Sequence, residues 1–268
     1  MFETRKPFSL LTMMALGILL IASGCKEEDT PARSTRYDLT VKDVLGVSGT
    51  VTFTEINSLS ATIDIVLVNA PVGTHPANLY MNSAIENGLV VLALNPVDAN
   101  GKSSTVVTSM NYSQLIAYDG HIKVLSSSID PFTIVAQADI GGNQLTTTHK
   151  SYTLNLVDAF EVSGTALLQK RLNGNTLLTI SLTGVIPGDS YPATINMGSV
   201  ASVGGGPVMK TLNHVNGTTG KSYTNIQKLN GGTDITYENW LVYDGYINVY
   251  QSSIATDNII TQGNIGSN

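Results

Sequence analysis

The sequence predicts an all-β protein made of two tandem domains, and three observations support this. The stretch Tyr237–Asn268 repeats the stretch Tyr112–Asn143 at one constant offset. Both copies contain runs in which apolar and hydroxyl residues alternate, the period of a strand with one buried face. Charged residues are only 13% of the 268 residues, and past the N-terminus no long window carries apolar residues at helical spacing. A chain of this length can bury two cores.

Alternating strands open the first copy, which we place at residues 37–143. Val47–Thr54 and Ile63–Leu67 each point apolar residues to one side and polar residues to the other. The polar link Glu55–Ser58 between them predicts a hairpin. The continuous apolar run Leu89–Leu94 predicts a strand buried on both faces.

The second copy, placed at residues 152–268, repeats this order. Its segment Gly217–Ser222 has some likeness to a phosphate-binding loop, but its spacing is too short and no helix follows, so we expect a hairpin loop. Asp119-Gly120 and its counterpart Asp244-Gly245 predict turns. The threonine-rich residues 144–151 are the expected linker between the copies.

The N-terminus predicts export. Residues 1–24 contain Arg5, Lys6 and the apolar run Leu10–Ile21, which ends in small residues before Cys25. The run is too short to span a membrane comfortably and is typical of a signal peptide.

Cys25 predicts a membrane anchor. It is the only cysteine, so it cannot form an internal disulfide, and its position after small residues resembles the lipobox of bacterial lipoproteins. That resemblance implies cleavage before Cys25 and its acylation. The acidic run Lys26–Asp29, in a linker over residues 25–36, is similar to export tags for the outer face of the outer membrane. The alternatives are an ordinary signal peptide and a solvated linker.

The charge distribution argues against a nucleic-acid partner. The formal net charge is −6, and no segment of the mature chain carries the cluster of Lys or Arg that phosphate recognition requires. We therefore expect a membrane-anchored cell-envelope protein with no nucleic-acid ligand.

The repeat also resembles a known family. The motifs VSGT, GKSxT, YDGxIxV and QxxIG occur in the same order in both copies, which looks like the CHRD domain first named for chordin. That domain is in turn similar to copper/zinc superoxide dismutase in its strand order. The resemblance implies that each copy is an eight-stranded Greek-key β-sandwich or flattened barrel.

The same resemblance argues against a metal centre. Family members closest to the dismutases carry histidines in patterns like HPAHIH and INVH, and here only His75 is kept. The other positions hold Asn78, Tyr80 and Leu125 in the first copy and Tyr191, Thr194, Asn196 and Tyr250 in the second. A copper or zinc site needs three or four converging ligands. We therefore expect no cofactor and no catalysis, with His75 the single candidate metal ligand.

The other three histidines are isolated from one another in the sequence. His121 is expected at a half-exposed position, His149 in the linker and His214 in a loop. Isolated histidines are more often solvated or hydrogen-bonded than bound to metal. The serine runs lack a paired histidine and acid, so nucleophilic catalysis has no support.

Aromatic residues cluster near the end of the second copy. Trp240 and Tyr243 are expected to face the core, since apolar or aromatic residues occupy the matching positions of the first copy. Tyr246 and Tyr250 share strand parity and form a candidate ligand face, with a purely structural role as the alternative.

The function that follows is a lipid-anchored cell-envelope protein, at the outer membrane and exposed at the cell surface. Its two non-catalytic CHRD-like domains would serve as a binding or scaffolding module toward a protein or glycan ligand. The alternative is an extracytoplasmic metal-binding or dismutase-like protein, in which His75 and ligands such as His121 or Asp119 would converge.

Overall fold

The computed structural model describes residues 32–157, 161–202 and 205–268. Arg33–Asn268 forms one compact unit. The signal peptide, Cys25 and the acidic run lie outside the described residues. Within the described residues, no helix is long and apolar enough to cross a membrane.

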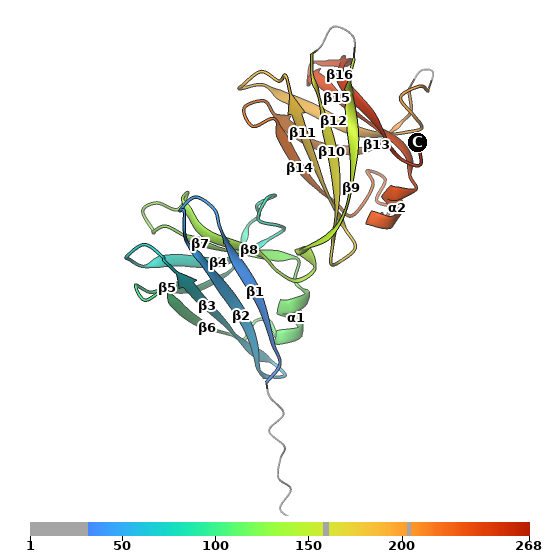
Figure 1. Cartoon of the computed structure of the whole chain (residues 1–268). Helices are drawn as coiled ribbons and strands as arrows, with labels where there is room; N and C mark the ends of the chain where they lie inside the picture. The colour runs from blue at the N-terminus through green and yellow to red at the C-terminus, as the bar shows by residue number, and fades with distance from the viewer. Residues whose placement is uncertain (1–31, 158–160, 203–204) are drawn as a thin grey trace, which may run out of the picture. The chain divides into compact units, whose positions relative to one another are not determined.

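The all-β prediction with two tandem eight-stranded sheets is confirmed (Figure 1). The first sheet has the strand order β5-β4-β7-β8-β1-β2-β3-β6. Its strands are β1 (Ser34–Val41), β2 (Ser48–Asn57), β3 (Ser60–Val68), β4 (His75–Met81), β5 (Val90–Val97), β6 (Lys102–Val107), β7 (Gly120–Leu125) and β8 (Ile134–Asp139). The β2–β3 hairpin is the one that the alternating pattern predicts.

The second sheet closes into a barrel of order β10-β11-β14-β13-β12-β15-β16-β9. Its strands are β9 (Leu145–Leu156), β10 (Ser163–Arg171), β11 (Thr176–Thr183), β12 (Ser190–Met197), β13 (Val208–Asn216), β14 (Lys221–Ile226), β15 (Asp244–Ser252) and β16 (Ala255–Gly266). Asn216 pairs with Lys221, so the segment that resembles a phosphate-binding loop is a hairpin, as predicted. Part of the expected linker at 144–151 belongs to β9, because Leu145 and the residues after it pair with β10.

Each sheet encloses its own hydrophobic core. Alternate residues of β2 and β3, such as Phe53, Ile63 and Ile65, are fully buried in the first. Ile180 and Ile247 are equally buried in the second. The alternating sequence pattern therefore places one face of each strand in a core, as period-two burial requires.

Two short helices complete the cores, and the sequence analysis did not predict them. They are α1 (Tyr112–Ala117) and α2 (Tyr237–Leu241), each begun by a capping box, with Asn111 and Thr236 as the N-caps. Trp240 on α2 is fully buried in the second core and Tyr243 packs against it. The prediction that these two aromatic residues face the core is confirmed.

The two Asp-Gly pairs do not form the predicted turns. Gly120 and Asp244 each begin a strand. The glycines are needed for a different reason: a Cβ on Gly120 would lie 2.6 Å from the Tyr118 ring, and a Cβ on Gly245 would lie 2.6 Å from the Tyr243 ring. Close packing against the tyrosine ring and against a carbonyl oxygen of the neighbouring strand, rather than a left-handed backbone, selects glycine here.

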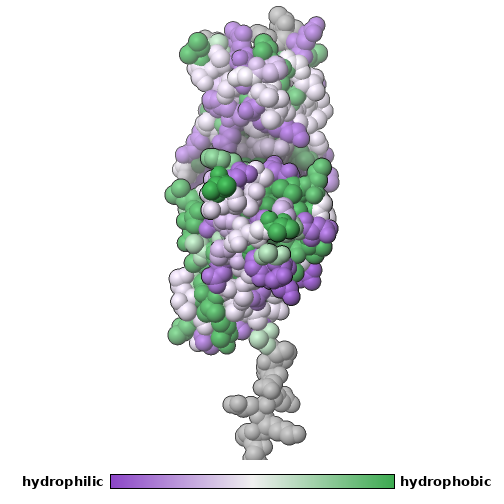
Figure 2. Space-filling model, turned by 90° about the vertical axis from the view of Figure 1, so that its left-hand side faces the viewer, coloured by the Kyte–Doolittle hydropathy of each residue, from purple (hydrophilic) through white to green (hydrophobic). Residues whose placement is uncertain are grey.

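Strand β5 is not buried on both faces, contrary to the prediction for Leu89–Leu94. Leu89 is 76% exposed and Val90 is 53% exposed, because β5 is an edge strand with β4 as its ladder partner. The Asn95 backbone N–H donates to the Thr105 hydroxyl and the Asn95 side-chain amide donates to the Ser104 carbonyl, which joins β5 to β6. Figure 2 shows hydrophobic surface, in green, on the half of the molecule that contains the first sheet.

Arg171 connects the second barrel to the first sheet, and its side chain is fully buried. Its Nη2 lies 3.7 Å from a carboxylate oxygen of Glu86, and its Nη1 lies 3.5 Å from one of Asp139. It also donates to the Asn143 carbonyl and, through Nε, to the Asn225 amide oxygen at 3.0 Å. This buried cation is shared by residues of both sheets.

Candidate ligand-binding site

The outer face of β12, β15 and β16 carries polar side chains where the opposite face carries the core. Ile195, Ile247 and Val249 point inward and are buried. Strand register places the polar residues in two rows across the strands, namely Asn196, Tyr246 and Asn264, then Thr194, Asn248 and Gln262. Such directly opposed side chains are close enough to interact.

A cavity of about 470 Å³ opens on this face. Its polar lining consists of Asn196, Ser202, Tyr246, Asn248, Tyr250 and Gln262. Val200, Val208 and Ile259 add apolar surface, and Gly205 and Gly206 contribute backbone. We refer to the cavity lined by these eleven residues as the polar cradle. Its volume lies in the range of small-molecule sites.

Hydrogen bonds between Thr194 and residues of the polar cradle have fixed donors and acceptors. Thr194 Oγ1 donates to Asn196 Oδ1 at 2.8 Å, so its one proton is used. It therefore accepts from the Tyr250 hydroxyl, 3.0 Å away. Asn196 Nδ2 in turn donates to the Tyr246 hydroxyl at 3.3 Å.

Tyr246 also receives a bond from the loop that follows β12. The backbone N–H of Gly206 donates to the Tyr246 hydroxyl at 2.8 Å. With two bonds accepted, this hydroxyl keeps its own proton for a further partner. Glycine is required at 206 because a Cβ would lie 1.7 Å from the Met197 carbonyl oxygen.

Asn248 lies at the centre of the polar cradle and has an unused acceptor. Its side chain is only 4% exposed, and its Nδ2 donates a long bond of 3.5 Å to the Tyr250 hydroxyl. Its Oδ1 has no hydrogen-bond partner among the described residues. A buried carbonyl without a partner is costly, so its presence at the floor of a cavity indicates a place for a ligand.

The matching face of the first sheet carries different side chains. His121 stacks on Tyr80 with ring centroids 5.0 Å apart, and Lys123 lies 5.3 Å from the centroid of the Tyr80 ring. Lys123 also bonds to the Asn87 side chain. His121 and Lys123 occupy the strand positions of Tyr246 and Asn248.

His121 is fully buried, so the prediction of a half-exposed position is wrong. Its Nδ1 bonds to the Asn82 carbonyl at 2.9 Å. Burial is the main cause that lowers the pKa of His121 to about 4, and the nearby Lys123 acts in the same direction. The Tyr80 ring stacks on the His121 imidazole. His121 is therefore buried, although it lies on the polar face of its strand.

His75 is the candidate metal ligand, and it lies in strand β4, with 2% of its surface exposed. Its two ring nitrogens each lie 2.8 Å from a backbone carbonyl oxygen, of Ser126 and of Pro71. Neither nitrogen therefore offers a free lone pair to a metal ion. Within the part of the chain that the structure describes, no group of three or more His, Cys, Asp or Glu residues could hold one.

His149 and His214 lie elsewhere. Both are in strands, β9 and β13, rather than in a linker and a loop as predicted. His149 is exposed, and His214 shares a hydrogen bond of 3.0 Å with Ser190. The structure does not bring either of them to His75 or His121 as a joint site.

Three positions that the CHRD resemblance associates with histidine do meet in the second barrel. Thr194, Asn196 and Tyr250 form the continuous chain of hydrogen bonds described above. The polar cradle therefore stands at the place where the resemblance puts a metal centre, with hydroxyl and amide groups in place of imidazoles.

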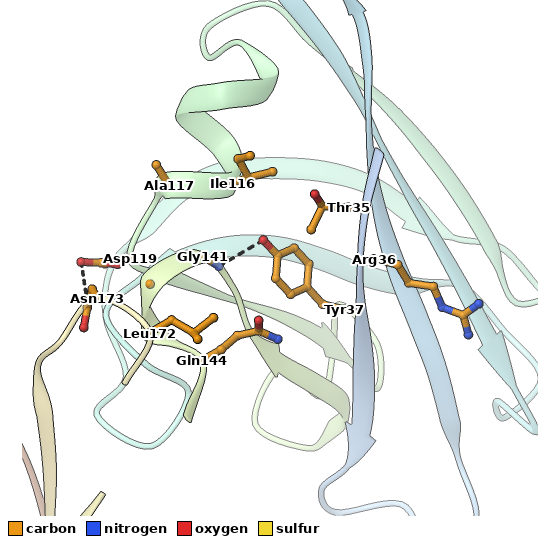
Figure 3. Close-up of a pocket in the computed structure, with 11 residues that line it drawn as sticks. Thr35, Arg36, Tyr37, Ile116, Ala117, Asp119, Gly141, Gln144, Leu172 and Asn173 are labelled. Atoms are coloured by element: carbon orange, nitrogen blue, oxygen red, sulfur yellow. Dashed lines mark hydrogen bonds between the residues drawn. The ribbon is translucent and has the colours of Figure 1, made fainter. Parts of the chain in front are cut away.

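A second cavity, of about 510 Å³, contains residues of both sheets (Figure 3). Two of its polar side chains already have partners. Tyr37 accepts from the Gly141 N–H at 3.3 Å, and Asp119 accepts from the Asn173 amide at 2.9 Å. The polar cradle, with its unpartnered carbonyl, is the stronger candidate site.

Two of the cradle residues, Tyr246 and Tyr250, are predicted from the sequence as a ligand face, and the others are not. Both line the polar cradle, although Tyr246 is buried rather than exposed. Asn248 shares their parity on β15, which is the signal that could have found it. Asn196 stands at a position that the CHRD resemblance associates with histidine, and the register between β12 and β15 brings it to Tyr246.

Comparisons with protein-family models, with curated proteins and with solved structures return no match for this chain.

Proposed function

We propose that the chain is a lipid-anchored cell-envelope protein whose two CHRD-like β domains form a non-catalytic binding module, with the polar cradle as its ligand site. Acylated Cys25 would hold the protein at the outer membrane, and the polar linker would give the β domains reach from the surface. The first sheet supports the second through Arg171, and the second presents the ligand site.

The unpartnered Oδ1 of Asn248 carries this proposal. This atom is buried, its residue lines the cavity, and a hydrogen bond from Asn248 Nδ2 to Tyr250 helps to keep the side chain in place without a ligand. A site organised before binding loses less entropy when a ligand enters.

The lining also supports binding rather than catalysis. All six polar side chains of the polar cradle are amides or hydroxyls. Among the described lining residues there is no histidine, carboxylate or lysine to act as a general acid or base at neutral pH.

The binding proposal is tested by ligand screening on ¹⁵N-labelled residues 33–268, the compact unit. A panel of neutral disaccharides, uronic acids, amino sugars and short peptides is titrated while the side-chain amide of Asn248 and the backbone amide of Gly206 are followed by NMR. We expect at least one class to shift both signals. If every class leaves both signals unmoved, the polar cradle is not a ligand site.

The anchor proposal is tested on the full chain in a Gram-negative host fed an alkyne fatty acid. We expect the wild type to incorporate the label and to sediment with membranes, and Cys25→Ala to lose both properties. A Ser34→Ala variant is the matched control, because Ser34 lies after Cys25 in the predicted linker and is not the proposed acylation site. Label retained by Cys25→Ala would contradict the anchor.

A further inference from the structure

We infer that the polar cradle binds a neutral saccharide, held by ring hydroxyls between the Tyr246 hydroxyl and the Asn248 Oδ1. This inference rests on the proposed function and names the ligand class of that same site. It follows from which hydrogen-bonding groups of the polar cradle already have a partner within the protein and which do not.

Two of the remaining groups, one donor and one acceptor, lie on neighbouring residues of the same face of β15. Tyr246 accepts from Gly206 and Asn196 and so keeps a proton to donate. Asn248 Oδ1 has no donor among the described residues. A sugar hydroxyl both donates and accepts, so two hydroxyls of one ring can use both groups at once. The sugar hydroxyls supply the missing donor without bringing a charge into the site.

The neutrality of the lining selects against charged ligands. A carboxylate or phosphate would need a cation or several N–H donors in exchange for its hydration, and an ammonium group would need a carboxylate. The lining of the polar cradle supplies neither among the described residues. Sugars with free carboxylates or amines should therefore bind more weakly than neutral ones.

The apolar part of the lining fits the other property of a saccharide. Val200, Val208 and Ile259 line the same cavity as the polar groups, and Tyr250 is half-buried there. A pyranose presents C–H groups on its ring faces and hydroxyls around its edge. Mixed polar and apolar lining with aromatic rings suits such an amphipathic ligand.

The inference is tested with maltose, cellobiose and N,N′-diacetylchitobiose as neutral probes, and with glucuronate, glucosamine and glycylglycine as the contrasting ones. NMR titrations use the wild type, Asn248→Leu and the control Thr179→Leu, which changes a polar outer-face residue on β11. We expect a neutral disaccharide to shift the Asn196 and Gly206 signals. Asn248→Leu should weaken that binding at least tenfold, and Thr179→Leu should leave it unchanged.

The outcomes separate this inference from the proposed function. If glucuronate or glycylglycine moves the cradle signals and the neutral sugars do not, the saccharide class is wrong while the site stands. If no probe moves them, both fail. If a neutral sugar binds equally well to Asn248→Leu, with a folded spectrum, the assigned contact is wrong and the inference is overturned.

Discussion

Asn248 combines a buried, unpartnered polar atom with a place in the lining of a cavity. Its Oδ1 is buried with no partner among the described residues, a situation that costs about 1–3 kcal/mol in proteins. If the side chain at position 248 served packing alone, an apolar side chain of similar size would make the protein more stable. This contrast separates a role in binding from a role in stability.

Replacing Asn248 by Leu should therefore raise the free energy of unfolding by about 0–1 kcal/mol. The variant would then be as stable as the wild type or slightly more stable. The change removes the orphan carbonyl and loses only one long bond to Tyr250. Urea unfolding of the wild type and the variant measures it. A loss of more than about 2 kcal/mol would show that Asn248 is structural, because that is the range of disrupted cores.

His121 makes stability depend on pH. The unfolded chain takes up a proton on this residue near its ordinary pKa of 6.5, whereas the folded chain does so only at about 4. Between these values the unfolded state binds more protons, so stability is lost as the pH falls, by at most ~1.4 kcal/mol for each pH unit. Burial is the main cause of the lowered pKa, and the charge of Lys123, which lies near the ring, acts in the same direction.

Urea unfolding at several pH values between 4 and 7 measures this dependence in the wild type and in His121→Gln. We expect the variant to have a shallower slope. The exposed residue His149 provides the control, and His149→Gln should keep the wild-type slope. Equal slopes in all three proteins would contradict a buried neutral imidazole.

At the scale of the element, strands β12 and β15 hold three side chains in contact with one another. Thr194, Asn196 and Tyr250 are joined by bonds of 2.8 and 3.0 Å. If the resemblance to dismutase-like domains is right, histidines at these positions should converge on one metal ion. Three imidazoles with an open fourth position are a common zinc arrangement.

The triple variant Thr194→His/Asn196→His/Tyr250→His should therefore retain about one Zn²⁺ or Cu²⁺ per chain after dialysis, measured by metal analysis. The matched control places three histidines on the outer face of β10 and β11, at Thr165, Thr179 and Ser181. A folded triple variant that retains no more metal than this control would argue against the resemblance.

Some strands and helices could be predicted from the sequence and others could not. Alternation predicts β2 and β3 because both have one face in the core. It misses α1 and α2, since five or six residues contain too few turns for a helical period, although Asn111 and Thr236 are good N-caps. It gives the wrong burial for β5, because an apolar run does not reveal an edge strand.

For the site, parity on β15 predicts Tyr246 and Tyr250 and could have included Asn248. The CHRD resemblance marks the position of Asn196, but only strand register shows that this residue meets Tyr246. Ser202 could not be predicted, because it reaches the polar cradle through a loop. Arg171 could not be predicted either. Its partners Glu86 and Asp139 are far from it in the sequence, and only the folded chain brings their charges together.

At the scale of the whole molecule, Arg171 holds residues of the two sheets in one compact unit. Its guanidinium is fully buried between the carboxylates of Glu86 and Asp139. Burial is the main cause that raises the pKa of Asp139, and Arg171 opposes that shift. Removing the cation would leave two partly buried carboxylates without compensation.

Arg171→Met should lower the free energy of unfolding by about 3–5 kcal/mol and separate the unfolding of the two sheets into two transitions. Calorimetry and urea unfolding measure both effects. The control is Arg36→Met, whose exposed pair with Asp38 spans 3.9 Å and should contribute less than about 1 kcal/mol.

Replacing the carboxylates as well, in Arg171→Met/Glu86→Gln/Asp139→Asn, should recover much of the lost stability, since the uncompensated charges are gone. If Arg171→Met unfolds like the Arg36→Met control, the buried cation does not couple the sheets.

The two repeats have come to use the same face differently, and this constrains how the protein can evolve. In the first repeat the face includes Asp139, which pairs with Arg171, so changes there would detach the repeat that follows. In the second repeat the matching position is Asn264, which carries no charge and bonds to the Val200 N–H. After a gene duplication, the second copy would be free to acquire new ligands while the first preserved the assembly.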